Sequence, residues 1–171
     1  MAATVDIREF NGVSPGTPTT KTSGTIRFKA ADDASVDLNN PIVRPGTGTV
    51  YSYEKVLRLR IGATGPTGAI TSPRAFSDGG NGFGTGVGLG AGVYGSYVQP
   101  VNTLSTKAPP SPGFFSYTSG SPLAMDVTNA GPYTGTNVDI ADFVYLQASV
   151  ASTASPGLTP TETATFAFDE T

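Results

Sequence analysis

The stretch VYSYEKVLRLRI, from Val50 to Ile61, decides the fold class. Its second half alternates apolar and charged residues with a period of two, which is the pattern of a β-strand with one buried face. The predicted inner face carries the odd-numbered residues Tyr53, Lys55, Leu57, Leu59 and Ile61. The other face carries Ser52, Glu54, Val56, Arg58 and Arg60, and we interpret the two arginines as solubilising residues of a solvated face. The stretch therefore predicts a sheet with one side in water.

Composition extends this interpretation to the whole chain. The 171 residues fit one domain, residues 1–171, that is large enough to bury a core. Only 13% of residues are charged, and 22 glycines and 14 prolines interrupt the sequence at short intervals, which leaves little room for long helices. About seven to nine short strands fit between these breaks. We predict an all-β fold, a two-sheet antiparallel sandwich of jelly-roll type with long Gly/Pro-rich loops.

Further strands follow from the same period. Residues 5–10 predict a first strand, and residues 26–29 predict a second with a basic outer face. Residues 143–150 and 161–170 predict a terminal hairpin, and we prefer strand to helix for the first of these because Phe143, Val144 and Tyr145 favour a sheet. Residues 13–23 and 100–112, rich in Pro, Gly, Ser and Thr, are predicted loops.

From Gly80 to Gly92 every even-numbered residue is glycine. If the run is extended, it has one face of bare backbone. Three interpretations stay open: a flexible loop, a glycine-spaced strand covered by a neighbouring segment or subunit, and a ligand cradle. The residues that follow lack helical periodicity, which disfavours a phosphate-binding loop. We place a candidate interface in this run, at Phe83, Gly86, Val87, Gly88 and Leu89.

Three aromatic residues follow the Pro-rich loop: Phe114, Phe115 and Tyr117. They either cap the core where the chain re-enters a sheet or form a contact patch or a sugar-stacking platform. We include all three in the candidate interface.

The chain has no histidine, cysteine or tryptophan. Ser-His-Asp and Cys-His relays, disulfides, and metal sites of imidazole or thiolate are therefore excluded. We expect no catalytic residues, no cofactor and no metal. Calcium could use the cluster Asp32, Asp33, Asp37, Asn39 and Asn40, but its spacing is not that of an EF-hand and these residues are common in turns. The remaining enzymatic possibility is a carboxylate-pair glycosidase that uses two of Asp32, Asp139, Asp142 and Glu162, and nothing in the spacing selects a pair.

Charge and hydropathy limit the partners. The net charge is −3, and the ten Lys and Arg residues are scattered, which argues against nucleic acid. No segment approaches the roughly 20 apolar residues of a membrane span, and the first residues lack the pattern of an export signal. We expect neither nucleic acid nor membrane as a partner.

Several segments, in this order, resemble small virion structural proteins of tailed bacteriophages. They are VDIREFNG at 5–12, NPI at 40–42, SYEKVLRLR at 52–60, DFVYLQ at 142–147 and ETATFAFDE at 162–170. The resemblance spans most of the chain, but the central glycine-rich part does not contribute to it. It implies an accessory component of the head shell or the tail, located in the virion and assembled in the host cytoplasm, and it brings no catalytic residues.

A passive role agrees with the composition. We therefore expect a capsid decoration (cement) protein that forms a dimer or trimer, binds the outside of the head shell and bridges major capsid subunits. The alternative is a tail, neck or fibre accessory module that binds host surface carbohydrate through the aromatic residues Tyr94, Tyr97, Phe114, Phe115 and Tyr117.

Overall fold

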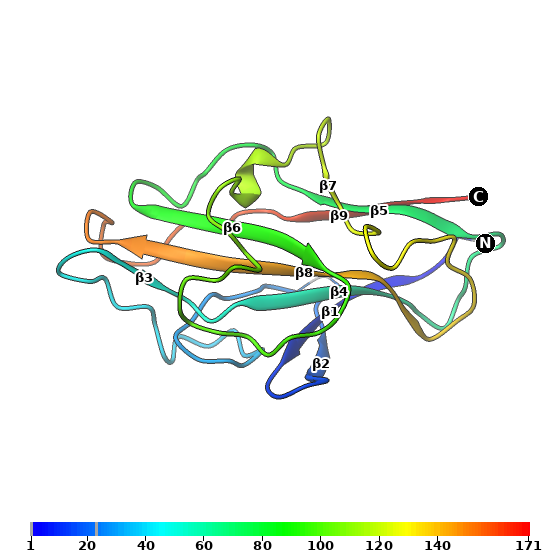
Figure 1. Cartoon of the computed structure of the whole chain (residues 1–171), viewed down its shortest axis with the longest axis horizontal. Helices are drawn as coiled ribbons and strands as arrows, with labels where there is room; N and C mark the ends of the chain where they lie inside the picture. Colours follow the sequence, from blue (N-terminus) through cyan, green and yellow to red (C-terminus); the bar gives the residue numbers. More distant parts are fainter. Residues whose placement is uncertain (1, 23) are drawn as a thin grey trace.

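The computed structural model describes residues 2–22 and 24–171, and within them the regular structure is almost entirely β (Figure 1). The strands are β1 (Val5–Asn11), β2 (Thr17–Thr20), β3 (Thr49–Tyr51), β4 (Lys55–Ile61), β5 (Ile70–Phe76), β6 (Val87–Tyr94), β7 (Leu123–Ala124), β8 (Val138–Ala151) and β9 (Thr165–Glu170). One 3-10 turn, η1, covers Phe114–Ser116. All strand pairs are antiparallel. No helix in the described part of the chain is long and apolar enough to cross a membrane.

The long strand β8 is the centre of the larger sheet (Figure 1). β6 pairs with residues 143–150 of β8 and occupies one of its edges. β3 and β4 both pair with the opposite edge of β8, one after the other, and β1 and β2 continue the sheet beyond β4. The preference for a strand over a helix around residues 139–150 is thus confirmed.

The predicted continuous strand 50–61 is wrong in one respect, because it is broken between β3 and β4. Ser52 still bonds β8, with its N–H to the Ala148 carbonyl at 2.9 Å and its hydroxyl accepting from the Ala148 N–H at 3.0 Å. Glu54 turns its N–H away to Val101. The predicted solvated side of the sheet is also wrong, because Glu54 and Val56 are buried under the loop that follows β6. Arg58, interpreted as a solubilising residue, binds backbone carbonyls of β8 instead. Alternation cannot reveal a face that loops cover.

β8 contains a wide irregularity opposite Arg58. Leu57 pairs with Val144 and Leu59 pairs with Ile140, so one residue of β4 lies opposite three residues of β8. Ala141 adopts a φ of 62°, which is uncommon for a residue other than glycine. The Arg58 Nε–H group donates to the carbonyls of Ile140 and Ala141, at 3.3 and 3.0 Å. The arginine therefore satisfies backbone groups that the bulge leaves without a ladder partner.

The smaller sheet has the order β7-β5-β9. The predicted terminal hairpin is wrong, because β9 pairs with β5 rather than with β8. Residues 152–164 between the two strands form no strand, and they carry the chain from one sheet to the other. The starts of β1 and β5 and the end of β9 lie at one end of the molecule (Figure 1).

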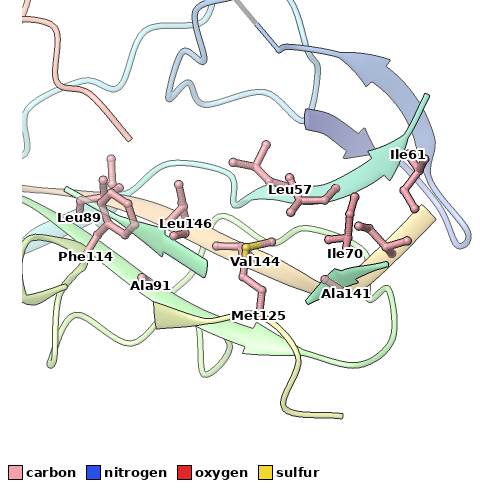
Figure 2. Packing of buried hydrophobic residues seen from close by; sticks show 14 residues of the cluster. Leu57, Ile61, Ile70, Leu89, Ala91, Phe114, Met125, Ala141, Val144 and Leu146 are labelled. Carbon is pink, nitrogen blue, oxygen red and sulfur yellow. The ribbon is translucent and has the colours of Figure 1, made fainter. Parts of the chain in front are cut away.

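Side chains from both sheets belong to one buried cluster. Phe114 and Leu89 gather at one end of it, and Ile61, Ile70 and Ala141 lie at the other (Figure 2). A second cluster on the opposite face of the larger sheet contains Phe10, Val56, Ala108, Phe143 and Tyr145. The larger sheet is therefore covered on both faces.

Two sequence predictions for the first 30 residues need correction. Residues 26–29 form no strand, although Ile26 and Phe28 pack against the main cluster, and Lys29 is buried rather than on an outer face. The predicted loop 13–23 contains the exposed strand β2, and its last residue, Ser23, lies outside the described residues. The first strand is confirmed as β1.

Candidate functional site

A cavity of about 720 Å³ lies against the inner face of the larger sheet. Leu89, Leu146 and Ala148 of β6 and β8 form its floor. Irregular segments 24–44 and 154–164 form much of its walls, and the Arg44 guanidinium joins them by donating to the Ala154 carbonyl at 3.1 Å. An apolar concave space bounded by irregular chain is the usual form of a site for an apolar ligand or a partner side chain.

Five of the eight predicted interface residues line this cavity: Phe83, Val87, Leu89, Phe114 and Phe115. The rings of Phe83 and Phe115 meet edge to face with centroids 5.6 Å apart. The glycine run and the aromatic triplet, which are more than twenty positions apart in the sequence, are thus brought together by the fold. Phe114 is 1% exposed and belongs to the core, as the core-cap interpretation of the aromatic triplet requires.

The other three predicted interface residues, Gly86, Gly88 and Tyr117, are outside the lining. Gly86 has a φ of +77°, and a Cβ there would lie 2.6 Å from the Ala154 nitrogen. Gly88 faces the Ser149 hydroxyl. Tyr117 packs against the main cluster, and its carbonyl accepts from the Ser77 N–H and hydroxyl. Within the chain these residues therefore have structural contacts.

The bare face of β6 is covered by a segment of the same chain. A Cβ on Gly90 would overlap the carbonyl oxygen of Ala108, and one on Gly92 would overlap that of Lys107. The Ala91 N–H donates to the Pro109 carbonyl at 3.3 Å, and Gly90 bridges to Gly113. For the second half of the run, the interpretation as a glycine-spaced strand covered by a neighbouring segment is thus correct. The first half, up to Gly86, is a loop.

Side chains of β8 and the β3–β4 connection hold the loop that follows β6. The Gln147 amide nitrogen donates to the carbonyls of Ser52, Val101 and Thr103, and its oxygen accepts from Ser105. The Glu54 carboxylate accepts from the Val101 N–H at 3.0 Å and from the Ser105 hydroxyl. Lys107 pairs with the same carboxylate at 3.3 Å. This long loop is therefore fixed by buried polar contacts.

Tyr145 anchors the beginning of the same loop. Its hydroxyl accepts from the Val98 N–H at 2.6 Å and donates to the Val98 carbonyl at 3.1 Å. Burial raises the pKa of Tyr145 to about 12, so the phenol is neutral at ordinary pH.

The acidic residues considered for calcium bind lysine and backbone groups. The Lys29 ammonium donates to Asp33 and Asp37, each at 3.0 Å, and Asp32 accepts from Asn11 and the Gly12 N–H. Hydrogen bonds from Ser35 and Lys29 lower the pKa of Asp37. In the part of the chain that the structure describes, no three acidic side chains gather as a metal site would require.

Three of the four carboxylates considered for a glycosidase, Asp32, Asp139 and Asp142, accept hydrogen bonds within the chain. Asp139 pairs with Arg8 and Arg60, at 2.9 and 3.3 Å. Asp142, fully buried at the bulge of β8, accepts from the N–H groups of Thr128 and Asn129. Glu162 lies against Gly82 at the wall of the cavity.

The aromatic residues considered for a sugar platform lie in different surroundings. Tyr97 packs on Phe10 and Phe143, and its hydroxyl donates to the Gly12 carbonyl at 2.7 Å. Burial raises the pKa of Tyr97. Tyr94 is 39% exposed and rests edge-on against Tyr145.

One edge strand lies beside the cavity. β9 is the last strand of the smaller sheet and pairs with β5 on one side. Phe166 of β9 and the preceding Ala164 line the cavity. The outer edge of β9 therefore offers backbone groups next to an apolar space.

Sequence reasoning missed a buried group of charged residues between β1 and β4. Glu9 and Lys55 are both fully buried and pair at 2.9 Å. The signal was present, because Lys55 falls on the apolar face of the alternating stretch 50–61.

No protein-family model, curated protein or solved structure matches this chain. Its function is therefore inferred from the sequence and the geometry of the site.

Proposed function

We propose that this chain is a non-enzymatic structural protein of a phage virion, a capsid decoration protein that binds the outside of the head shell and bridges major capsid subunits. The observation that carries the proposal is the position of the β9 edge beside the apolar cavity. An extended segment of a neighbouring subunit can add to this edge through main-chain hydrogen bonds and insert alternate apolar side chains into the cavity.

We also propose that one domain spans the chain and that its two sheets form a jelly-roll-like sandwich around the main cluster. Buried polar contacts that fix the loops support a rigid body that transmits load between neighbours, because satisfied polar networks hold loops in one conformation. The protein itself forms a dimer or trimer.

Binding to the shell tests the proposal. Purified protein is added to expanded heads that lack it, and bound copies and the temperature at which the heads open are measured. We expect binding and a higher opening temperature. If the protein does not bind, or if the opening temperature stays the same, the proposal is wrong.

A matched pair of variants locates the binding site. Val87→Asp puts a charge at the partly buried wall of the cavity, and Val13→Asp puts the same charge at a site that is 73% exposed and distant in sequence. We expect Val87→Asp to abolish binding and Val13→Asp to retain it, because an apolar side chain cannot enter beside an unpaired carboxylate. Equal binding by two folded variants would exclude the cavity as the contact site.

A further inference from the structure

A lysine, a carboxylate and an asparagine meet in the interior where β1 ends beside the start of β4. The side chains of Glu9 and Lys55 are each 1% exposed, and Nζ lies 2.9 Å from Oε1. The Asn11 Nδ2 atom donates to the same Oε1 at 3.4 Å. The register that pairs Phe10 with Val56 places Asn11 opposite Lys55 at its next step. One carboxylate oxygen therefore holds both the amine and the amide.

Two oxygen atoms of this group have no hydrogen-bond partner. Among the described residues, Glu9 Oε2 and Asn11 Oδ1 are the buried side-chain atoms left without one. Buried polar atoms without partners are rare and require an explanation. Here the two atoms are a carboxylate oxygen and an amide oxygen, and both residues lie beside the Lys55 amine or its partner oxygen.

We propose that Lys55 and Asn11 form an intramolecular isopeptide bond with Glu9 as the proton carrier. The Lys55 ammonium first gives a proton to Glu9, which converts a buried ion pair into two neutral groups. The neutral Nζ then attacks Cγ of Asn11, while the Glu9 acid stabilises the developing charge on Oδ1. The second Nζ proton passes through Glu9 to Nδ2, the Cγ–Nδ2 bond breaks, and ammonia leaves. The ammonia takes up the first proton from Glu9 and departs as ammonium, which returns Glu9 to its carboxylate form. No oxidant or other reactant is needed.

The neighbouring groups favour the product. Lys21 Nζ lies 3.6 Å from Glu9 Oε2, so two ammonium groups share one carboxylate before the reaction. After Lys55 becomes an amide, Glu9 and Lys21 remain as a one-to-one ion pair, and the interior no longer holds the Lys55 cation. The Asp33 carbonyl accepts from Nζ at 2.5 Å, and Asp32 holds Asn11 at 3.0 Å, so both reacting groups are positioned.

The bond would join β1 to β4 in a chain without cysteine. Proteins that lack disulfides and must resist force or heat need another covalent staple or a large core. The inference does not depend on the proposed role in a virion, because the chemistry is complete within one chain.

Mass spectrometry of the purified full chain tests the proposal. We expect the intact denatured protein to be lighter than its sequence by one ammonia, about 17 Da. Trypsin should release residues 9–21 joined to residues 30–58, because a modified Lys55 is not cleaved and Arg44 precedes proline. Release of the two segments as separate peptides of unmodified mass would overturn the proposal.

The Asn11-Gly12 sequence requires a specific control, because a succinimide at Asn11 loses the same mass. A succinimide leaves residues 9–21 as a linear peptide, and a deficit confined to that peptide would overturn the proposal. Lys55→Arg keeps the charge and should abolish the branched peptide. Glu9→Gln keeps both reacting groups and should also abolish it, whereas Lys29→Arg, at a neighbouring buried ion pair, should retain it. If a variant does not fold, the peptide map of the protein without substitutions still shows whether the isopeptide bond is present.

Discussion

The bare α-carbon of Gly90 lies under the carbonyl oxygen of Ala108, so a side chain at position 90 and the segment above it cannot share this space. The obstructing atom belongs to the backbone of residues 107–109, which also bonds the edge of β6. Movement of this atom would disturb several contacts at once.

We expect Gly90→Ala to lower the free energy of unfolding by about 1–3 kcal/mol, as overpacking does. Gly120→Ala is the control, because a Cβ there would meet nothing within 4 Å. Urea unfolding of both variants measures the difference. Equal stabilities would mean that segment 107–109 moves aside freely.

Substitutions of Arg58 and Arg60 are predicted to differ in how much they lower the stability, although the two residues occupy the same face of β4. The Arg58 guanidinium bonds two carbonyls of the β8 bulge and lies 4.6 Å from the centroid of the Phe143 ring. Arg58→Gln should cost about 1–3 kcal/mol, because those carbonyls lose a charged donor. Arg60→Gln removes one partly exposed ion pair with Asp139 and should cost less than about 1 kcal/mol. Equal losses in thermal unfolding would contradict the role of Arg58 in the bulge.

Gln147 is predicted to control the mobility of the loop after β6. Gln147→Leu removes three donated bonds and one accepted bond, and we expect the amide of Ser105 to exchange its hydrogen faster, together with its neighbours. Gln99→Leu makes the same change at an exposed position of the same loop and should leave the exchange unchanged. Hydrogen exchange with mass readout distinguishes the two. Unchanged protection in Gln147→Leu would show that the apolar contacts alone hold the loop.

The contacts of Asp37 predict that the stability of the fold depends on pH in the acid range. The pKa of Asp37 lies below the ordinary value of 3.8. The contribution of Asp37 to the stability is therefore fully present above pH 3.8, and it is lost as the pH falls from there through the lowered pKa. Burial lowers the pKa of Lys29, but its hydrogen bonds to Asp33 and Asp37 outweigh this and the net shift is upward. The partner cation therefore stays charged until the pH exceeds 10.5.

We expect Asp37→Asn to lower the melting temperature at neutral pH, and the difference from the original protein should shrink as the pH falls from about 4 to about 2. Melting curves over this range check the expectation. A difference that is constant with pH would assign the effect to packing rather than to charge.

Strands could be predicted from the sequence more reliably than the strands with which they pair. The period of two located β1, β4, β8 and β9, since alternation depends only on local burial. It could not show that β9 joins β5, because pairing depends on where the long connection 152–164 takes the chain. The bulge opposite Arg58 was also hidden, since its residues are apolar on both sides of Asp142 and give no local signal.

The candidate site was found in part. The glycine run and the aromatic triplet were singled out separately, and the fold brings five of their residues to one cavity. Segments 24–44 and 154–164, which complete its walls, have no periodicity that would indicate a shared role. The pairing of Glu9 with Lys55 required the register of two strands that are 46 positions apart at these residues.

The covered edge of β6 also limits how molecules of this kind can associate. Residues 109–113 occupy that edge, and β2 at the other end of the larger sheet is four exposed residues interrupted by Pro18. The remaining edge strands are β3 with three residues, β7 with two and β9 with six, so β9 is the longest of them. The β9 edge can add one extended segment, whereas an open-ended fibre built by strand addition needs two long free edges in each molecule.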